Sequence, residues 1–140
     1  MYKRQAPHDD LPDWVADADA GVVIYDDAVR NNLYCEPGKL TDYLSVGVPV
    51  IAPDFPTVGP LVRALGIGVT FEGGRPEAIA EATRRCLAQP KESWGPALDA
   101  ACAKLNWESQ VPSLLAAVTG AFPTEEAASA PRLAPPEADR

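Results

Sequence analysis

The residues best suited to chemistry in this chain lie at the start of a short predicted helix, at Pro37, Gly38, Lys39 and Leu40. Proline can open a helix, because its fixed φ is helical and its missing N–H would have no partner there. The first N–H groups of a helix are unpaired and carry the positive end of its dipole, so they attract anions such as phosphate. These residues therefore predict an anion site.

Several residues near this helix start also have a purely structural interpretation. Lys39 either neutralises phosphate charge or is simply solvated. Gly38 either lets a ligand approach the backbone or relaxes the start of the helix. Asp42 stands three residues after Lys39, so on spacing alone it is a partner of that lysine in an exposed helix pair. Glu36 would repel a phosphate, which favours a solvated loop acid.

The elements around this stretch place it at the end of a strand. Leu40, Tyr43 and Leu44 fall on one face of the helix, and Gly47 ends it as a residue free to adopt a positive φ. Residues 48–52 form an apolar run without alternation, which is typical of a strand covered on both faces. A helix start that points out of a parallel sheet is a natural place for a ligand.

Helices and strands alternate along the rest of the chain. Strands are predicted over 21–25, 48–52 and 68–71, and helices over 8–19, 37–46, 60–65, 76–89, 94–105 and 107–118. Residues 26–32 are turn-rich and predict a loop. The pattern predicts an α/β fold, a doubly wound parallel sheet of about three strands with helices on both faces. So few strands favour half of a Rossmann-like domain.

Three local details are also predicted. Asp9 or Asp10 caps the first helix. Glu81 lies four residues before Arg85, the spacing of a helical ion pair. Asn106 caps the last helix, in which Pro112 introduces a kink or a restart.

Composition excludes several classes of function. The chain has 12 basic and 20 acidic residues and a formal charge of -8, which argues against binding to nucleic acid. No apolar run approaches the roughly 20 residues that span a bilayer. Cys35, Cys86 and Cys102 are far apart and odd in number, which favours free thiols and a cytoplasmic location. His8 is the only histidine, which leaves little for a zinc site or a serine–histidine triad.

The two ends of the chain differ from its middle. Residues 1–5 resemble the read-through of a sequencing adapter, and the alternative is a short disordered basic terminus. Residues 121–140 are rich in alanine, proline and acids, which predicts a disordered tail. One folded domain is expected over 6–120.

Four segments together resemble the C-terminal part of a GT-B glycosyltransferase, the second half of its nucleotide-sugar-binding domain. They are LPDWVADADAGV at 11–22, PGKLTDYLSVGVPVIA at 37–52, GIGV at 66–69 and NWE at 106–108. Each segment is weak alone, but their order and spacing match the family, and the resemblance covers residues 7–118.

The resemblance implies a role for the segment from Tyr34 to Asp42. In such enzymes this segment, with Pro37, Gly38, Lys39 and Leu40, holds the nucleotide diphosphate of a sugar donor, and the carboxylate at Asp42 holds the ribose hydroxyls. Many members carry two glutamates eight residues apart, but here Tyr34 occupies the first position and aspartate the second. Because tyrosine cannot replace a carboxylate, the pair is incomplete.

The resemblance also implies sugar transfer with retention of configuration, without a metal or other cofactor. No nucleophile or general base is assigned, because these belong to parts outside this chain. The same holds for the domain that binds a carbohydrate or lipid-linked acceptor, and peripheral membrane contact of the intact enzyme stays open. We expect the 140-residue chain alone to have no transferase activity. Two alternatives remain: a sugar-nucleotide epimerase of the same architecture, and a stand-alone flavodoxin-like binding module.

Overall fold

The computed structural model describes residues 7–118, except for the side chain of His8. Contacts divide the chain into two compact units between Lys104 and Leu105. This boundary lies inside the range 6–120 that the sequence assigns to one domain. The predictions for residues 1–5 and 121–140 fall outside the described residues.

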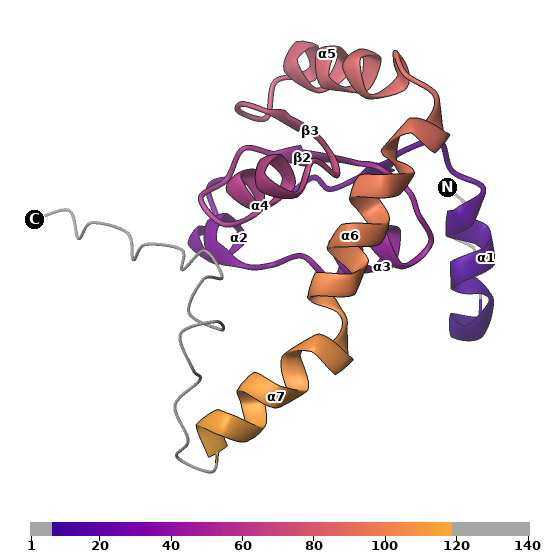
Figure 1. The fold of residues 1–140 in the computed structure, drawn as a ribbon. Helices are drawn as coiled ribbons and strands as arrows, with labels where there is room; N and C mark the ends of the chain where they lie inside the picture. The colour runs from indigo at the N-terminus through magenta and orange to yellow at the C-terminus, as the bar shows by residue number, and fades with distance from the viewer. Residues whose placement is uncertain (1–6, 119–140) are drawn as a thin grey trace, which may run out of the picture. The chain divides into compact units, whose positions relative to one another are not determined.

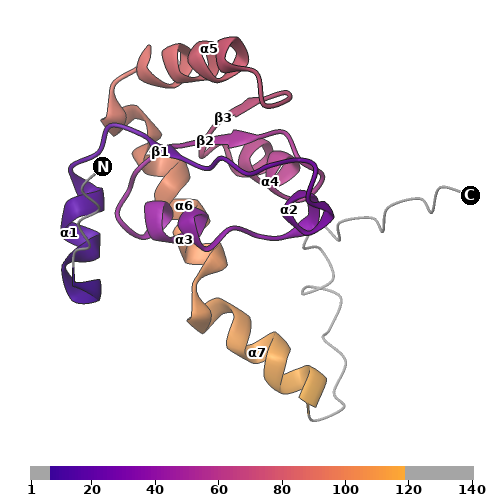
Figure 2. The ribbon, with the colours of Figure 1, turned by 180° about the vertical axis from the view of Figure 1, so that it is seen from behind.

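A parallel sheet of three strands, in the order β1-β2-β3, forms the centre of the first unit (Figures 1 and 2). Its strands are β1 (Gly21–Val22), β2 (Val50–Pro53) and β3 (Gly68–Phe71). Gly21 is in register with Val50, and Val50 with Gly68. The α/β class with about three parallel strands, consistent with part of a Rossmann-like fold, is thereby confirmed.

Helices lie on both faces of this sheet. Figures 1 and 2 show α5 (Pro76–Leu87) on one face, and α3 (Gly38–Ser45) and α4 (Val58–Leu65) on the other. α3 and α4 share a face because each lies in a crossover between neighbouring parallel strands, and such crossovers are nearly always right-handed. The remaining helical segments are His8–Asp10, α1 (Leu11–Ala16), α2 (Arg30–Tyr34), Lys91–Trp94, α6 (Gly95–Leu105) and α7 (Trp107–Val118).

Two strands differ from the predicted ranges. The prediction of 21–25 for the first strand is too long. Among residues 7–118, β1 pairs with β2 alone, and the last backbone hydrogen bond between them runs from Val23 N–H to Ile51 O. The prediction of 48–52 for the second begins too early. Val48 N–H donates to Tyr43 O at 2.9 Å and so closes the end of α3 instead of joining the sheet.

A short helix, α2, occupies part of the predicted loop 26–32. Two contacts hold it. The side-chain amide of Asn32 donates to Asp26 O at 2.8 Å, and the Thr57 hydroxyl donates to Tyr34 O at 3.1 Å from 23 residues away. The second contact is tertiary, which explains why turn-rich residues gave no helical signal.

Helix ends agree with the sequence where glycine or asparagine sets them. Gly47 and Gly66 adopt φ values of 69° and 65°, in the left-handed region that suits glycine at a helix end. Asn106 Oδ1 accepts the Ser109 N–H at 2.7 Å, which confirms the predicted cap. Asp10 stands at the start of α1 but makes no capping hydrogen bond with its side chain. The predicted restart at Pro112 is wrong, since α7 continues through it.

The core of the first unit lies around β2, whose four residues are all buried. The other buried apolar side chains of this unit come from helices on both faces of the sheet and from the adjoining turns, among them Leu40, Leu44, Val62, Ile67, Ala82 and Leu98. The burial of all four residues explains why the strand reads as an apolar run without alternation.

The predicted ion pair in α5 forms with a different partner. Glu81 pairs with Arg84, one turn away at spacing three. Arg85 reaches the sheet instead, where its guanidinium donates to Thr70 O at 3.3 Å. Both spacings are possible on a helix surface, and here Arg85 contacts a strand carbonyl of β3 while Glu81 pairs at the shorter spacing.

Over residues 7–118, no helix is both long enough and apolar enough to cross a membrane.

Candidate functional site

The start of α3 is open to solvent at the carboxyl edge of the sheet. Because α3 leads from the end of β1 to the start of β2, its N-terminus lies at the edge where the strands end. Pro37 is the residue before the helix, with φ -71° and ψ 126°, and no side chain caps this end. A Cβ at Gly38 would meet nothing within 4 Å. Space and unpaired N–H groups are therefore both present there.

Leu40 and Pro37 anchor the start of α3 in the protein core. The Leu40 side chain is fully buried, and its N–H donates to Pro37 O at 2.9 Å. Pro37 is buried as well. The two residues hold the first turn in place, so the parts of this turn that face solvent are the backbone of Gly38 and the side chain of Lys39.

Lys39 extends toward β1 and not along its own helix. Its ammonium nitrogen lies 5.6 Å from the centre of the Tyr25 ring, within the range of a cation–π contact. It forms no ion pair with Asp42, since the ion pairs within residues 7–118 join other residues. The lysine charge is thus held at the carboxyl edge of the sheet.

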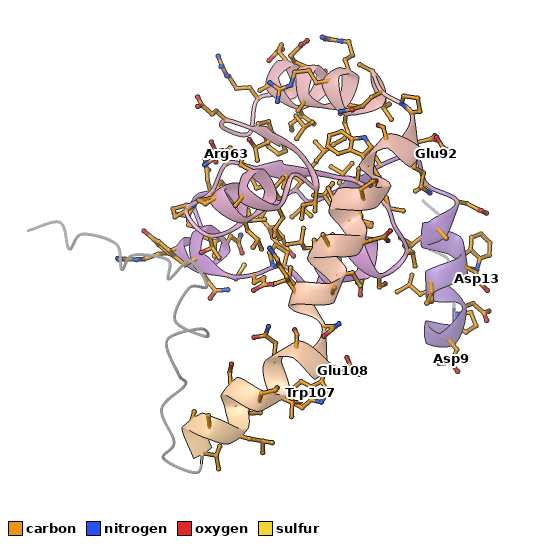
Figure 3. The ribbon with its side chains drawn as sticks, viewed as in Figure 1. Asp9, Asp13, Arg63, Glu92, Trp107 and Glu108 are labelled. Carbon is orange, nitrogen blue, oxygen red and sulfur yellow. The ribbon has the colours of Figure 1, made fainter. Side chains whose placement is uncertain are left out.

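Asp42 faces a pocket between α1 and α3, which we call the α1–α3 pocket. It encloses about 220 Å³ and is lined by Leu11, Pro12 and Val15 together with Asp9, Asp42 and Ser45. Asp9 belongs to the short helical turn His8–Asp10 that leads into α1, at the lower end of that helix in Figure 3. The structure therefore places Asp42 and Lys39 on different sides of the first turns of α3.

Tyr34 lies at the end of α2, with 40% of its surface exposed. Its backbone oxygen accepts the Thr57 hydroxyl, which ties α2 to the residue before α4. The side chain lines neither the α1–α3 pocket nor the second pocket described next. Glu36 is exposed, in agreement with a solvated loop acid.

A second pocket opens where all three strands end, and we call it the carboxyl-edge pocket. It encloses about 350 Å³. Its lining comes from the residues that end or follow each strand, Ile24, Tyr25, Asp26, Asp27, Pro53, Phe55, Phe71, Gly73 and Gly74. The sequence analysis missed this pocket. The sequence feature that could have indicated it is an aromatic residue at or just beyond the end of each predicted strand. Open α/β sheets bind ligands at this edge.

Titratable groups outside these pockets show one clear perturbation. Burial raises the pKa of the Cys86 thiol, which lies on α5 against the sheet. Within the described part of the chain, no group of three or more His, Cys, Asp or Glu side chains is placed to hold a metal ion.

Comparison of this chain with models of protein families, with curated proteins and with solved structures finds no match.

Proposed function

We propose that this chain is part of a glycosyltransferase and binds the nucleoside diphosphate of a sugar donor at the start of α3. The observation that carries the proposal is the combination of an uncapped, open helix start at the carboxyl edge with a lysine held beside it. Such a start provides N–H donors and a positive dipole for phosphate oxygens. The resemblance of residues 7–118 to the donor-binding half of GT-B enzymes supports the same assignment.

The proposed roles follow the first turns of the helix. The N–H groups of Gly38 and Lys39 and the lysine ammonium donate hydrogen bonds to the diphosphate. The Asp42 carboxylate accepts hydrogen bonds from the ribose hydroxyls. Asp42 lies about 4.5 Å along the helix axis from Lys39 and faces the α1–α3 pocket, so a nucleotide that contacts both residues must extend from the helix start toward that pocket. Donors already in place for the leaving diphosphate would stabilise the charge that grows on it during transfer.

The outer edge of β1 supports the further proposal that the sheet continues beyond it. In the described residues β1 pairs with β2 alone. Val22 and Ile24 beside this edge are 37% and 53% exposed. Parallel sheets are normally paired and covered, so an apolar parallel edge indicates that further strands pack there in the intact protein. Reading the frame upstream of codon 6 tests this. Additional βα units support the proposal, and an in-frame stop close by contradicts it.

An amide NMR titration with UDP and GDP tests the nucleotide site. We expect the signals of Gly38 and Lys39 to shift with the diphosphates, and to shift far less with uridine and guanosine, because the helix start recognises phosphate. Lys39→Gln should weaken diphosphate binding on the order of tenfold, the loss expected for a charged hydrogen bond.

The matched control is Lys104→Gln, which removes an exposed lysine from α6. It should leave the affinity unchanged. Equal shifts with nucleosides and nucleoside diphosphates, or equal losses in the two lysine variants, would show that the start of α3 is not a phosphate site.

A further inference from the structure

Lys91 holds the end of α1 from 75 residues away in the sequence. Its ammonium nitrogen donates a hydrogen bond to the backbone oxygen of Ala16 at 2.6 Å, and the contact is partly buried. Ala16 is the last residue of α1, where backbone oxygens lack helical partners and carry the negative end of the helix dipole. A positive charge is favourable at this end, so Lys91 both caps and tethers the helix.

The helix that Lys91 caps has little else to hold it. α1 has six residues, none of them is buried, and no side chain caps its start. A helix this short is not stable on its own in water. Among residues 7–118, no other hydrogen bond or ion pair joins α1 to another helix or to a strand. The contact with Lys91 therefore carries a large share of what fixes α1 in place.

The turn that carries Lys91 is itself anchored in the core. Trp94, at the other end of the short helix Lys91–Trp94, is only 9% exposed. The N–H and the hydroxyl of Ser93 both donate to Pro90 O, at 3.0 and 2.7 Å, and close the turn from within. Figures 1 and 2 show this turn, between α5 and α6, next to the end of α1 from which the chain continues to β1. Lys91 thus joins a weakly supported helix to a firmly packed turn.

The position of α1 matters because this helix forms one wall of the α1–α3 pocket. Leu11, Pro12 and Val15 line the pocket from α1, and Asp42 lines it from α3. α3 is held independently of α1, since two of its leucines are buried in the core. A movement of α1 therefore widens the pocket while Asp42 stays in place.

We propose that Lys91 is a positioning residue that keeps the α1–α3 pocket closed beside Asp42. Loss of its charge frees the end of α1, and the helix then moves away from α3 and admits more water to the carboxylate. Hydrogen bonds to Asp42 weaken as its surroundings become more aqueous. This last step rests on the proposed function, because a ribose at Asp42 is what the open pocket would hold less tightly. Lys91 contacts no part of the nucleotide and acts through α1.

Amide hydrogen exchange, followed by NMR, tests the tether without any ligand. Lys91→Gln keeps a polar side chain but removes the charge. The amides of Val15, Ala16 and Ala18 should then exchange on the order of tenfold faster, the loss expected for a charged hydrogen bond, while those of β2 keep their rates. Lys91→Arg retains a charged donor and should keep the rates of the unmodified chain.

The matched control is Glu92→Gln, which removes a charge from an exposed neighbour in the same turn (Figure 3). It should leave the exchange of α1 unchanged. Unchanged exchange of α1 in Lys91→Gln would overturn the inference. Equal acceleration in α1 and β2 would overturn it as well, because Lys91 would then stabilise the whole unit and not the position of α1.

NMR titration with UDP and 2′-deoxy-UDP tests the effect on the pocket. Lys91→Gln should lower the affinity for UDP about threefold to tenfold and reduce the preference for ribose, because the hydrogen bonds at Asp42 become more exposed to water. Lys91→Arg and Glu92→Gln should retain both the affinity and the preference. A ribose preference that survives in Lys91→Gln, although α1 exchanges faster, would show that the tether does not control the pocket.

Failure of the proposed function gives a different result. If the unmodified chain binds neither nucleotide, the proposed function is wrong. The role of Lys91 then stands if Lys91→Gln speeds exchange in α1 and shifts the amide signals of Asp42 and Ser45, which line the pocket. It falls if those signals stay where they are in the unmodified chain.

Discussion

The ring of Tyr43 lies directly against the Cα of Gly21. A Cβ at position 21 would overlap the ring carbons, and the Tyr43 hydroxyl donates to the neighbouring Val22 O at 3.4 Å. This contact ties the second turn of α3 to the edge strand β1. It therefore fixes the helix whose start faces the carboxyl edge, and glycine at position 21 is what permits the close approach.

Gly21→Ala tests this packing. We expect a loss of about 1–3 kcal/mol in the free energy of unfolding, because the added methyl group overfills the contact with Tyr43. Urea denaturation measures the change. Gly74→Ala is the control, since a Cβ there meets nothing within 4 Å. In a Tyr43→Ala background the cost of Gly21→Ala should fall, as expected for two residues in contact. An equal cost in both backgrounds would contradict the account.

The cap of α7 supplies a second prediction. Asn106→Ala removes the acceptor of the Ser109 N–H and should cost about 1 kcal/mol of helix stability. Asn106→Asp keeps an oxygen acceptor and should preserve most of it. Far-UV circular dichroism and amide exchange at the first turn of α7 measure both variants. Equal loss of helix in the two variants would show that the side-chain oxygen does not hold this end.

The buried thiol of Cys86 predicts a pH dependence. Burial raises its pKa, so the folded chain keeps the proton at pH values where the unfolded chain loses it. Above the ordinary thiol pKa of about 8.5, the free energy of unfolding should fall as pH rises, and it should not respond to this group at lower pH.

Urea denaturation of the unmodified chain and of Cys86→Ala, at about pH 7 and about pH 9.5 on either side of the ordinary thiol pKa, measures this effect. The alanine variant starts less stable, because it leaves a cavity, but it loses less stability toward high pH. Leu87→Ala, which removes an exposed side chain and no thiol, should retain the slope of the unmodified chain. Parallel slopes for all three chains would contradict the assignment.

Elements governed by local signals were predictable from the sequence. The range of β3 agrees with the prediction because glycines flank a short apolar run. The start of α7 agrees because Asn106, the residue before the helix, caps it. The helix of Gly38–Ser45 was found for the same reason, with Pro37 before it and Gly47 after it. In each case residues within one turn decide the boundary.

Features that depend on distant residues were not predictable. The short helix α2 is held by Thr57 from beyond the next strand. Lys39 contacts Tyr25 across the edge of the sheet and not Asp42 in its own helix. The carboxyl-edge pocket gathers residues from the ends of three strands, and only their convergence in space makes it a site. Spacing along the chain carries no direct record of such contacts.

The most direct test of the central claim concerns Asp42 and the ribose. The affinities of UDP and GDP, and of their 2′-deoxy forms, are measured by NMR titration for the unmodified chain, Asp42→Asn and the control Asp99→Asn. We predict that the unmodified chain binds the ribose forms on the order of tenfold more tightly than the deoxy forms. Asp42→Asn should remove this preference, and Asp99→Asn should keep it. Equal binding of ribose and deoxyribose nucleotides to the unmodified chain, or a preference that survives Asp42→Asn, would contradict the claim.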